Sequence, residues 1–456
     1  MSLNAGLNRR AFLRNASMTA IVGAAVGSGT SLTGAAAAAA PGDLAENGGK
    51  FDFDTPYNRI GTDCTKWDQP MRTYGLDSLV AGMGIADMDF RCAPVITKAL
   101  TERLQHENWG YLDQPRSFVE GIAAWNKRKY NINVNPDSVV VTTGVHPALI
   151  AALKTFSPPG SKVLLLTPTY NGFYGDIRYC GLTPEESTLK IGADGRHSID
   201  FADFERRISH DTNTFILCNP QNPTGNMWSR ADLSRLGEIC LRRRVVVLAD
   251  EIHCDFNNKG VNYTPFMTLD NKDVVMNSIT FKAASKSFGL AAMKCGWFFS
   301  DNMDYIRRVR ANNRTDLTTL GMIASKAAYE GGEDWLRQAV EYIDGNHAFV
   351  ESYVKANIPL VKAYKPEGTY LQWIDVSQVI DKIGAKKTAA DQSTGGRTVT
   401  PETIVEQFLV KNARVHLNQG ASYGAGSAGR MRMNIATSRK TLENALSAMA
   451  TALHRV

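Results

Sequence analysis

An asparagine, an acid and a lysine stand along the chain in an order that suits one kind of cofactor chemistry. Asn222 lies in the turn 219–225 (NPQNPTG), Asp250 ends an apolar run, and Lys286 lies between two serines. A lysine amine can form an imine with an aldehyde, a carboxylate can pair with a protonated ring nitrogen, and an amide can donate to a phenolic oxygen. Pyridoxal phosphate (PLP) presents all three groups, so the sequence predicts a PLP site.

Each of these features is common when it occurs alone. Turns with Asn-Pro and loops with Ser-Lys-Ser occur on many surfaces, and an acid often ends a strand. Taken together and in this order, they resemble the fold-type I aminotransferase superfamily (class I/II). The resemblance runs from about Phe51 to the C-terminus.

The likeness is greatest to one branch, the C–S lyases of the cystathionine β-lyase and maltose-regulator type. It is carried by the segments 65–68 (TKWD), 85–90 (IADMDF), 250–253 (DEIH) and 285–288 (SKSF). His253 matters most, because general aminotransferases usually carry tyrosine there. The resemblance implies a PLP-dependent transferase fold of type I, with a large α/β domain around a mostly parallel sheet and a smaller α+β domain.

The same resemblance implies roles for the residues around the cofactor. Lys286 matches the catalytic lysine, whose amine binds the cofactor as a Schiff base and then moves the substrate α-proton. Asp250 matches the partner of the ring nitrogen, and Asn222 matches the donor to the phenolic oxygen. His253 either contacts that oxygen as well or packs behind the ring.

The phosphate is expected at the start of a helix. Gly144, Val145 and His146 follow an apolar run and open a helical stretch, so a flexible glycine and two backbone amides are available to an anion. Ser285 and Lys294 are expected to complete the site. Relatives frequently carry an arginine near Lys294, so we expect a weaker phosphate contact at this position.

Three further residues are assigned by resemblance. Tyr170 matches the aromatic residue that stacks on the cofactor ring. Tyr111 matches a catalytic residue that reaches the phosphate region of the neighbouring subunit, which implies a homodimer with shared active sites. Arg432 matches the arginine that binds the substrate carboxylate through two parallel hydrogen bonds, and Arg430 is its nearest competitor in the sequence.

These residues would serve any PLP reaction that begins by removing the α-proton of an amino acid, including racemisation or oxidation, and two such reactions are the main candidates. A C–S β-lyase would cleave an S-substituted L-cysteine to thiol, pyruvate and ammonia. An aminotransferase would pass the amine to a 2-oxo acid. The resemblance around His253 favours the lyase, and the complete set of site residues disfavours a protein that only binds. Gly84 lies where relatives often carry a bulkier aromatic, which predicts a wider substrate pocket.

The α/β domain is also indicated by the apolar pattern of the chain. Four runs are β-branched or wholly apolar, as strands covered on both faces should be. They are residues 139–141, 163–166, 215–217 and 245–248. A long helix is predicted at about 336–360 and a strand at 370–376.

The expected organisation has four parts. They are a leader at 1–40, an N-terminal segment at 41–95 that joins the small domain, a large PLP-binding domain at 96–335 and a small domain at 336–456. Within the last part, residues 384–400 are polar and of low complexity. We expect a mobile surface loop there.

The leader predicts export. Arg9 and Arg10 precede Ala11-Phe12-Leu13, a weakly apolar stretch follows, and a run of small residues ends at Ala40. This pattern is typical of a twin-arginine signal peptide, so a periplasmic or extracellular location is expected. The apolar stretch is too short and too often interrupted to predict a stable membrane span.

Composition narrows the expected partners to small molecules. The chain has 456 residues, of which 43% are hydrophobic and 21% charged, as in an ordinary globular enzyme of two domains. The net charge of +6 includes the arginines of the leader, and the remainder is too weakly basic to predict binding of nucleic acid. The expected partner is an amino-acid substrate. The seven cysteines show no metal-binding spacing, and the pattern leaves a disulfide open.

Overall fold

The computed structural model of the chain describes residues 49–396 and 398–456. The segment 1–40, predicted to be a twin-arginine leader, lies outside the described residues, so the leader and export stay predictions. The described residues belong to a single unit that spans Pro41–Val456. The predicted divisions at 95/96 and 335/336 therefore also stay predictions. In the described part of the chain, no helix has the length and apolar character needed to cross a membrane.

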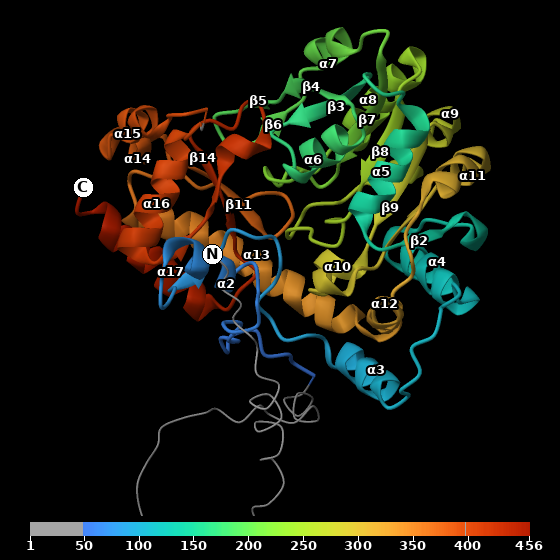
Figure 1. Cartoon of the computed structure of the whole chain (residues 1–456), viewed down its shortest axis with the longest axis horizontal. Helices are drawn as coiled ribbons and strands as arrows, with labels where there is room; N and C mark the ends of the chain where they lie inside the picture. Colours follow the sequence, from blue (N-terminus) through green and yellow to red (C-terminus); the bar gives the residue numbers. More distant parts are fainter. Residues whose placement is uncertain (1–48, 397) are drawn as a thin grey trace, which may run out of the picture. The chain divides into compact units, whose positions relative to one another are not determined.

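A seven-stranded sheet forms the α/β part of the protein (Figure 1). Its strand order is β2-β10-β9-β8-β7-β3-β4, and only β10 runs antiparallel to its neighbours. The predicted α/β fold with a mostly parallel sheet is thus confirmed. The strands are β2 (Val140–Thr142), β3 (Lys162–Thr167), β4 (Thr183–Thr188), β7 (Thr212–Cys218), β8 (Val246–Asp250), β9 (Ser278–Lys282) and β10 (Gly296–Phe299).

Alternate residues of the central strands point to opposite faces of this sheet, and helices cover both faces. Val163 and Leu165 pack with α5 (Val145–Phe156), α6 (Gly172–Tyr179) and α11 (Met303–Asn312). Leu164 and Leu166 pack with α7 (Phe201–Arg207), α8 (Arg230–Arg243) and α9 (Lys272–Met276). Burial on both faces explains why these strands are apolar throughout.

The remaining elements lie around and beyond this sheet. On one side, α3 (Pro94–Leu104), α4 (Arg116–Tyr130) and α12 (Thr319–Gly331) pack together, and α13 (Glu333–Asn357) leads away as the predicted long helix. The C-terminal part carries α14 (Ser377–Lys382), α15 (Ala385–Gln392), α16 (Pro401–Ala413), α17 (Arg439–Leu453) and a sheet in the order β11-β14-β13. Its strands are β11 (Leu371–Asp375), β13 (Asn418–Gln419) and β14 (Arg430–Asn434).

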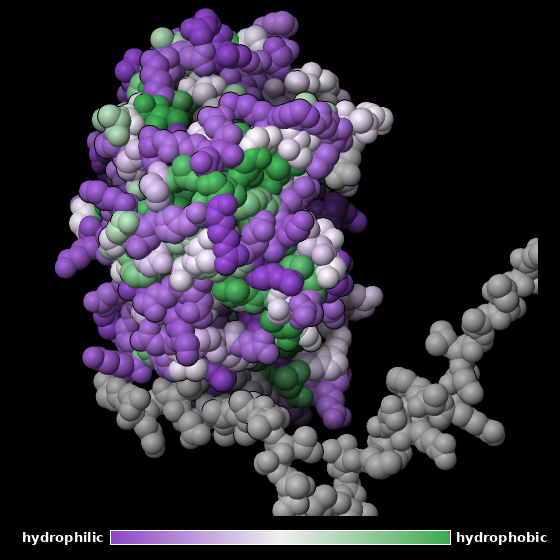
Figure 2. Space-filling model, turned by 90° about the vertical axis from the view of Figure 1, so that its left-hand side faces the viewer, coloured by the Kyte–Doolittle hydropathy of each residue, from purple (hydrophilic) through white to green (hydrophobic). Residues whose placement is uncertain are grey.

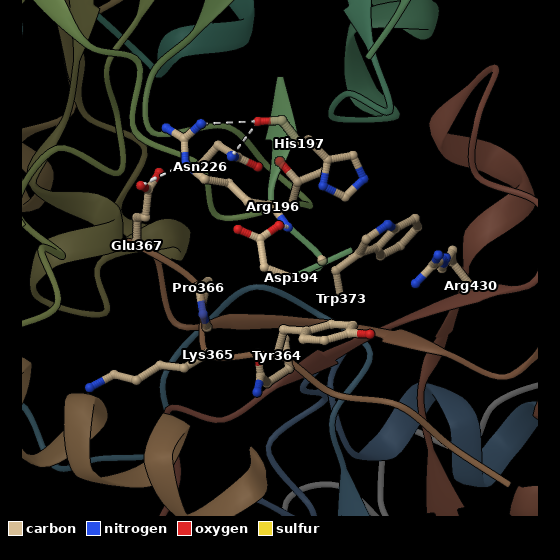
Figure 3. A pocket seen from close by; sticks show the side chains of 13 residues that line it. Asp194, Arg196, His197, Asn226, Tyr364, Lys365, Pro366, Glu367, Trp373 and Arg430 are labelled. Atoms are coloured by element: carbon tan, nitrogen blue, oxygen red, sulfur yellow. Dashed lines mark hydrogen bonds and ion pairs between the residues drawn. The ribbon is translucent and has the colours of Figure 1, made fainter. Parts of the chain in front are cut away.

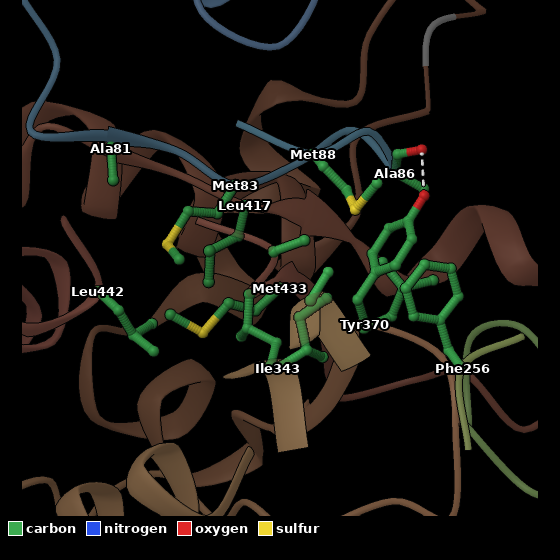
Figure 4. Close-up of a cluster of buried hydrophobic side chains, with 14 of the residues drawn as sticks. Ala81, Met83, Ala86, Met88, Phe256, Ile343, Tyr370, Leu417, Met433 and Leu442 are labelled. Atoms are coloured by element: carbon green, nitrogen blue, oxygen red, sulfur yellow. Dashed lines mark hydrogen bonds between the residues drawn. The ribbon is translucent and has the colours of Figure 1, made fainter. Parts of the chain in front are cut away.

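The N-terminal segment joins the C-terminal part. After α2 (Asp68–Tyr74), β1 (Ala81–Gly82) pairs in parallel with β12 (Val415–His416). Met83 then lies against Leu417, Met433 and Leu442 in a shared hydrophobic cluster, which Figure 4 shows. A segment from the start of the chain is therefore built into the core of its last part.

The expectation of a loop is wrong for the first half of 384–400. Ala385–Gln392 form helix α15, which packs against α16, with Ala385 and Ala389 buried. These alanines lie four residues apart and therefore on one face of the helix. The polar composition hid this narrow apolar stripe.

The face of the protein that carries these helices is mostly hydrophilic, with a smaller hydrophobic area near its middle (Figure 2).

Two of the segments that carry the family resemblance bind each other. Lys66 is fully buried and its Nζ lies 2.8 Å from Asp89 Oδ2, while Trp67 Nε1 donates to Asp89 Oδ1 at 3.0 Å. Arg59 adds a second ion pair to Asp89 at 3.0 Å. These contacts hold the segment 83–89 in place, and its backbone carbonyls reach the candidate site described below.

Replacing Lys66 with methionine is expected to lower the free energy of unfolding by about 3 kcal/mol, because Asp89 would remain buried with one partner fewer. Urea unfolding monitored by circular dichroism measures this change. The double variant Lys66→Met/Asp89→Leu is expected to recover part of the loss, since it removes the buried charge as well. A double variant no more stable than the single one would show that the ion pair does not explain the effect.

Candidate functional site

A cavity of about 570 Å³ opens at the carboxyl ends of the central strands, where ligands bind in open α/β sheets. It is bounded by the start of α5, the turn after β7, the end of β8, and α10 (Ala284–Ser287). Every residue predicted to bind the cofactor lines it. These are Gly144, Val145, His146, Tyr170, Asn222, Asp250, His253, Ser285, Lys286 and Lys294.

Lys286 extends from α10 into this cavity. Its Nζ donates a hydrogen bond of 2.7 Å to the carbonyl of Ala86. Burial lowers the pKa of the Lys286 amine to about 8, and the nearby charge of Arg432 acts in the same direction. A larger share of this amine is therefore neutral near neutral pH than in an ordinary lysine, as a nucleophile or a base requires.

Lys282, the lysine nearest to Lys286 in the sequence, has partners outside the cavity. Its Nζ donates to Asn126 Oδ1 at 3.2 Å and lies 3.5 Å from Glu251 Oε2, over the ring of Tyr130. It does not line the cavity. Of the described lysines, only Lys286 and Lys294 line the cavity.

Asp250 and His253 are two polar residues that line the cavity. Asp250 is buried at the end of β8, and burial raises its pKa to about 6 although the amide of Ile252 donates to its Oδ1 at 3.1 Å. Burial also lowers the pKa of His253 well below its usual value, so this imidazole is neutral. Within the described chain its Nδ1 has no hydrogen-bond partner. A buried carboxylate in this setting gains stability from a cationic partner.

The start of α5 is shaped to receive an anion. Gly144 precedes the helix with a φ of 147°, a conformation that favours glycine. The free backbone amides of Val145 and His146 and the helix dipole attract negative charge. Ser285 and Lys294 line the same cavity, so the geometry agrees with a phosphate at this end.

Arg432, on β14, does not itself line the cavity but contacts Asn222, which does. Its Nη1 donates to Asn222 Oδ1 at 3.2 Å and its Nη2 to the carbonyl of Gly84 at 2.8 Å. Its guanidinium carbon lies 5.2 Å from the centre of the Tyr423 ring. The side chain is buried, and in the described part of the chain its Nε has no partner. This guanidinium is positioned and still able to bind a further acceptor.

Arg430, the other arginine considered for the substrate carboxylate, lines a different cavity. Its guanidinium lies 3.4 Å from Asp375 and faces a second, smaller cavity of about 180 Å³. Figure 3 shows this cavity, where Arg430 lies near Trp373 and Tyr364 and across from His197. None of the residues predicted for the site lines the second cavity.

Gly84 does not widen the pocket, contrary to the expectation from its small size. A side chain at this position would begin 2.6 Å from the imidazole ring of His416. The space beside Gly84 is thus filled by a residue more than three hundred positions away in the chain. The sequence could not indicate this contact, because the two residues meet only through the pairing of β1 with β12.

Tyr111 lies outside the cavity. Its side chain is fully exposed, and neighbouring Trp109 is also exposed. Tyr111 therefore takes no part in the site of its own chain, and its role toward a second subunit stays a prediction. All seven cysteines, which lie in the described residues, are free.

Two side-chain contacts near the cofactor cavity were not anticipated. The backbone amide of His146 was predicted to bind the phosphate. Its imidazole also contacts Asp176 and Tyr170. Asp176 lies on α6 and carries no motif of its own. The only hint of these contacts in the sequence was a histidine two residues after Gly144, at the start of a predicted helix, whose side chain had no assigned role.

Comparisons with known proteins agree with this site. The family described as aminotransferase class I and II matches residues 80–449. Cystathionine beta-lyase PatB of Bacillus subtilis is 34% identical over 410 residues, which cover 88% of this chain and 100% of that protein. Protein MalY of Escherichia coli is 27% identical over 414 residues, covering 89% and 100%. The crystal structure of cystalysin from Treponema denticola, which contains pyridoxal 5'-phosphate, matches with a TM-score of 0.80 and 26% identity, covering 89% of this chain and 99% of that one.

The residues present fit this cofactor. The cavity offers a partly neutral amine at Lys286, a buried carboxylate at Asp250, an anion site at the start of α5 and an aromatic face at Tyr170. Its volume lies within the usual range for small-molecule sites. The roles of the individual residues stay predictions, whereas the predicted superfamily, fold and cofactor are confirmed. The chain belongs to the aminotransferase class I and II family, and it is an enzyme of fold type I that depends on pyridoxal phosphate.

Proposed function

We propose that this enzyme is a C–S β-lyase that cleaves an S-substituted L-cysteine, such as a cystathionine-like thioether, to a thiol, pyruvate and ammonia. The observation that carries the proposal is the 34% identity to a cystathionine beta-lyase over the whole length of that protein. The resemblance of the sequence around His253 also favours this branch over general aminotransferases. The site geometry described above supports such a reaction.

Pyridoxal phosphate, when bound, withdraws electrons from the Cα of an amino acid and makes its proton removable. Asp250 would hold the ring nitrogen, the amides after Gly144 would hold the phosphate, and Tyr170 would cover the ring. Asn222 would donate to the phenolic oxygen. The amide can do so only through its nitrogen, and this fits because its oxygen already accepts from Arg432.

Arg432 would bind the substrate carboxylate. Its position between Asn222 and the carbonyl of Gly84 fixes the guanidinium, so the substrate would be oriented rather than merely attracted. Lys286 would then take the α-proton. Its lowered pKa suits this step, because a base works best when its pKa lies near the working pH.

Elimination follows from the substrate rather than from a further residue. When Cα gains the electron pair of its C–H bond, a thiolate on Cβ can leave with the electrons of the C–S bond. Lys286 lines the cavity, so its amine could return the proton to the departing sulfur. Addition of water to the remaining three-carbon fragment gives pyruvate and ammonia, so atoms and charges balance.

The test is a paired assay on the mature holoenzyme with a panel of S-substituted cysteines. Thiol and pyruvate are measured together, with and without an added 2-oxo acid. A β-lyase is expected to release thiol and pyruvate in equal amounts, independent of the oxo acid. Turnover only in the presence of the oxo acid, without thiol release, would contradict the proposal.

An aminotransferase is the second candidate, and the family to which the chain belongs favours it. The same residues would serve it, because both reactions begin with the α-proton. The two differ in where the proton goes next, so a new amino acid formed from the oxo acid identifies the transferase in the assay above.

We also propose that the enzyme is a homodimer in which Tyr111 completes the site of the other subunit. The full exposure of Tyr111 in a single chain supports this proposal. Tyr111→Phe is expected to lower kcat/KM by about tenfold through one lost hydrogen bond to a charged group. Co-expression of Tyr111→Phe with Lys286→Ala is expected to restore activity, because mixed dimers contain one site with both residues intact. No recovery in purified mixed dimers would exclude the shared site.

A further inference from the structure

His146, Asp176 and Tyr170 form a connected polar group at the edge of the cofactor cavity. His146 Nδ1 lies 2.6 Å from Asp176 Oδ2, and His146 Nε2 lies 3.3 Å from the Tyr170 hydroxyl. Because a carboxylate only accepts, Asp176 fixes Nδ1 as the protonated nitrogen. The orientation of the imidazole is thus set by a residue on α6 rather than by the helix that carries it.

The backbone makes room for this arrangement. A side chain at Gly172 would begin 2.6 Å from the His146 ring and 2.5 Å from the Tyr170 ring. Only glycine at this position lets both rings approach. Their centres lie 5.5 Å apart with a tilt of 47°, so the two residues pack as well as bind.

The hydrogen bond between His146 and Tyr170 can run in either direction. When the imidazole is neutral, Nε2 has a lone pair and accepts the Tyr170 O–H. When the imidazole is protonated, Nε2 donates, and the Tyr170 oxygen becomes the acceptor. The Tyr170 O–H must then turn away from His146. Tyr170 lines the cavity, so the turned hydroxyl can face what is bound there.

We propose that His146 is a positioning residue, held by Asp176, whose protonation state decides whether Tyr170 directs its hydroxyl at the imidazole or into the cofactor cavity. The proposal rests on the cofactor site and not on the choice between elimination and amine transfer. Its failure would leave the proposed lyase reaction untouched.

The groups around His146 move this change to a pH above the ordinary imidazole pKa. The hydrogen bond to Asp176 raises the pKa of His146, and the charge of Asp250 adds to the effect, whereas burial and Lys286 oppose it. Burial also raises the pKa of Tyr170, which keeps its hydroxyl protonated. Of these two residues, the one that titrates is therefore His146, through its imidazole.

The test uses the visible absorption of the holoenzyme, which reports on the surroundings of the cofactor bound to Lys286. Spectra are recorded from about pH 5.5 to 9, around and above the ordinary imidazole pKa of about 6.5. The wild type is expected to show an inflection above that ordinary value. His146→Gln keeps a polar side chain that does not titrate and is expected to lose the inflection. Asp176→Asn is expected to move it to lower pH.

Two further variants complete the test. Tyr170→Phe keeps the ring but removes the hydroxyl, and it is expected to lose the inflection while His146 still titrates. His210→Gln changes an exposed histidine outside the cavity and is expected to leave the inflection in place. An inflection that persists unchanged in His146→Gln, or the absence of any inflection in the wild type, would overturn the proposal. Persistence in Tyr170→Phe would also overturn it, since the signal would not pass through the hydroxyl.

Discussion

Replacing Lys286 with alanine is expected to lower kcat/KM by at least about 10⁴-fold, because in the proposed mechanism this one side chain supplies both the amine that binds the cofactor and the base that moves the proton. The structure supports both uses. Lys286 is buried in the cavity with its pKa lowered to about 8, and a single hydrogen bond to Ala86 orients its amine. The measurement is thiol release under saturating and limiting substrate.

The control for this variant is Lys382→Ala, at an exposed lysine on α14. It is expected to keep wild-type kinetics. The Lys286→Ala protein should still unfold at a similar temperature, which separates loss of chemistry from loss of fold. Activity within tenfold of the wild type would mean that another group acts as the base, and Lys294 would be the first to examine.

Replacing Arg432 with glutamine is expected to raise KM by about 30- to 4,000-fold. Truncating one partner of a buried, hydrogen-bonded charge pair costs about 2 to 5 kcal/mol, and each 1.4 kcal/mol is a factor of ten. Arg432 is buried and already held by Asn222 and Gly84, so the carboxylate of the substrate would meet a rigid guanidinium. Steady-state kinetics with one S-substituted cysteine measure the change.

Two matched variants sharpen this prediction. Arg432→Lys keeps the charge but loses the fork of parallel donors, so its KM is expected to fall between those of the wild type and Arg432→Gln. Arg430→Gln removes the neighbouring guanidinium, which pairs with Asp375 instead. Its KM is expected to stay within threefold of the wild type. A larger effect at Arg430 than at Arg432 would reverse the assignment of the carboxylate site.

Much of the fold could be predicted because the strands of a parallel sheet leave a strong mark on the sequence. Burial on both faces demands continuous apolar residues, and the runs around Val163 and Val246 were visible for this reason. The helix α15 could not be predicted in this way. Its apolar face consists of little more than Ala385 and Ala389, and alanine contributes too little hydrophobicity to stand out among polar neighbours.

The site shows the same division between local and distant signals. Lys286, Asp250 and Asn222 each lie in a short motif, and all three line one cavity. The contacts that depend on distant partners were invisible. His416 fills the space beside Gly84 only because β1 pairs with β12. Asp176 meets His146 only because α6 packs beside α5.

The segments 65–68 and 85–90 illustrate why a resemblance can be informative before its meaning is known. They contain no residue that lines the cofactor cavity. The buried ion pair of Lys66 with Asp89 instead holds in place the segment 83–89, whose backbone reaches the site. From that backbone, Gly84 accepts from Arg432 and Ala86 accepts from Lys286. Ala86 also accepts from the Tyr370 hydroxyl, the hydrogen bond that is dashed in Figure 4.

The most direct measurement follows the nitrogen of the substrate. The holoenzyme is given an S-substituted L-cysteine labelled with ¹⁵N at its amine, together with an unlabelled 2-oxo acid. If the enzyme is a C–S β-lyase, the label appears as ammonium, in step with the thiol, and the oxo acid stays unchanged. If the label appears instead in a new amino acid made from the oxo acid, the enzyme is an aminotransferase and the proposed function is wrong.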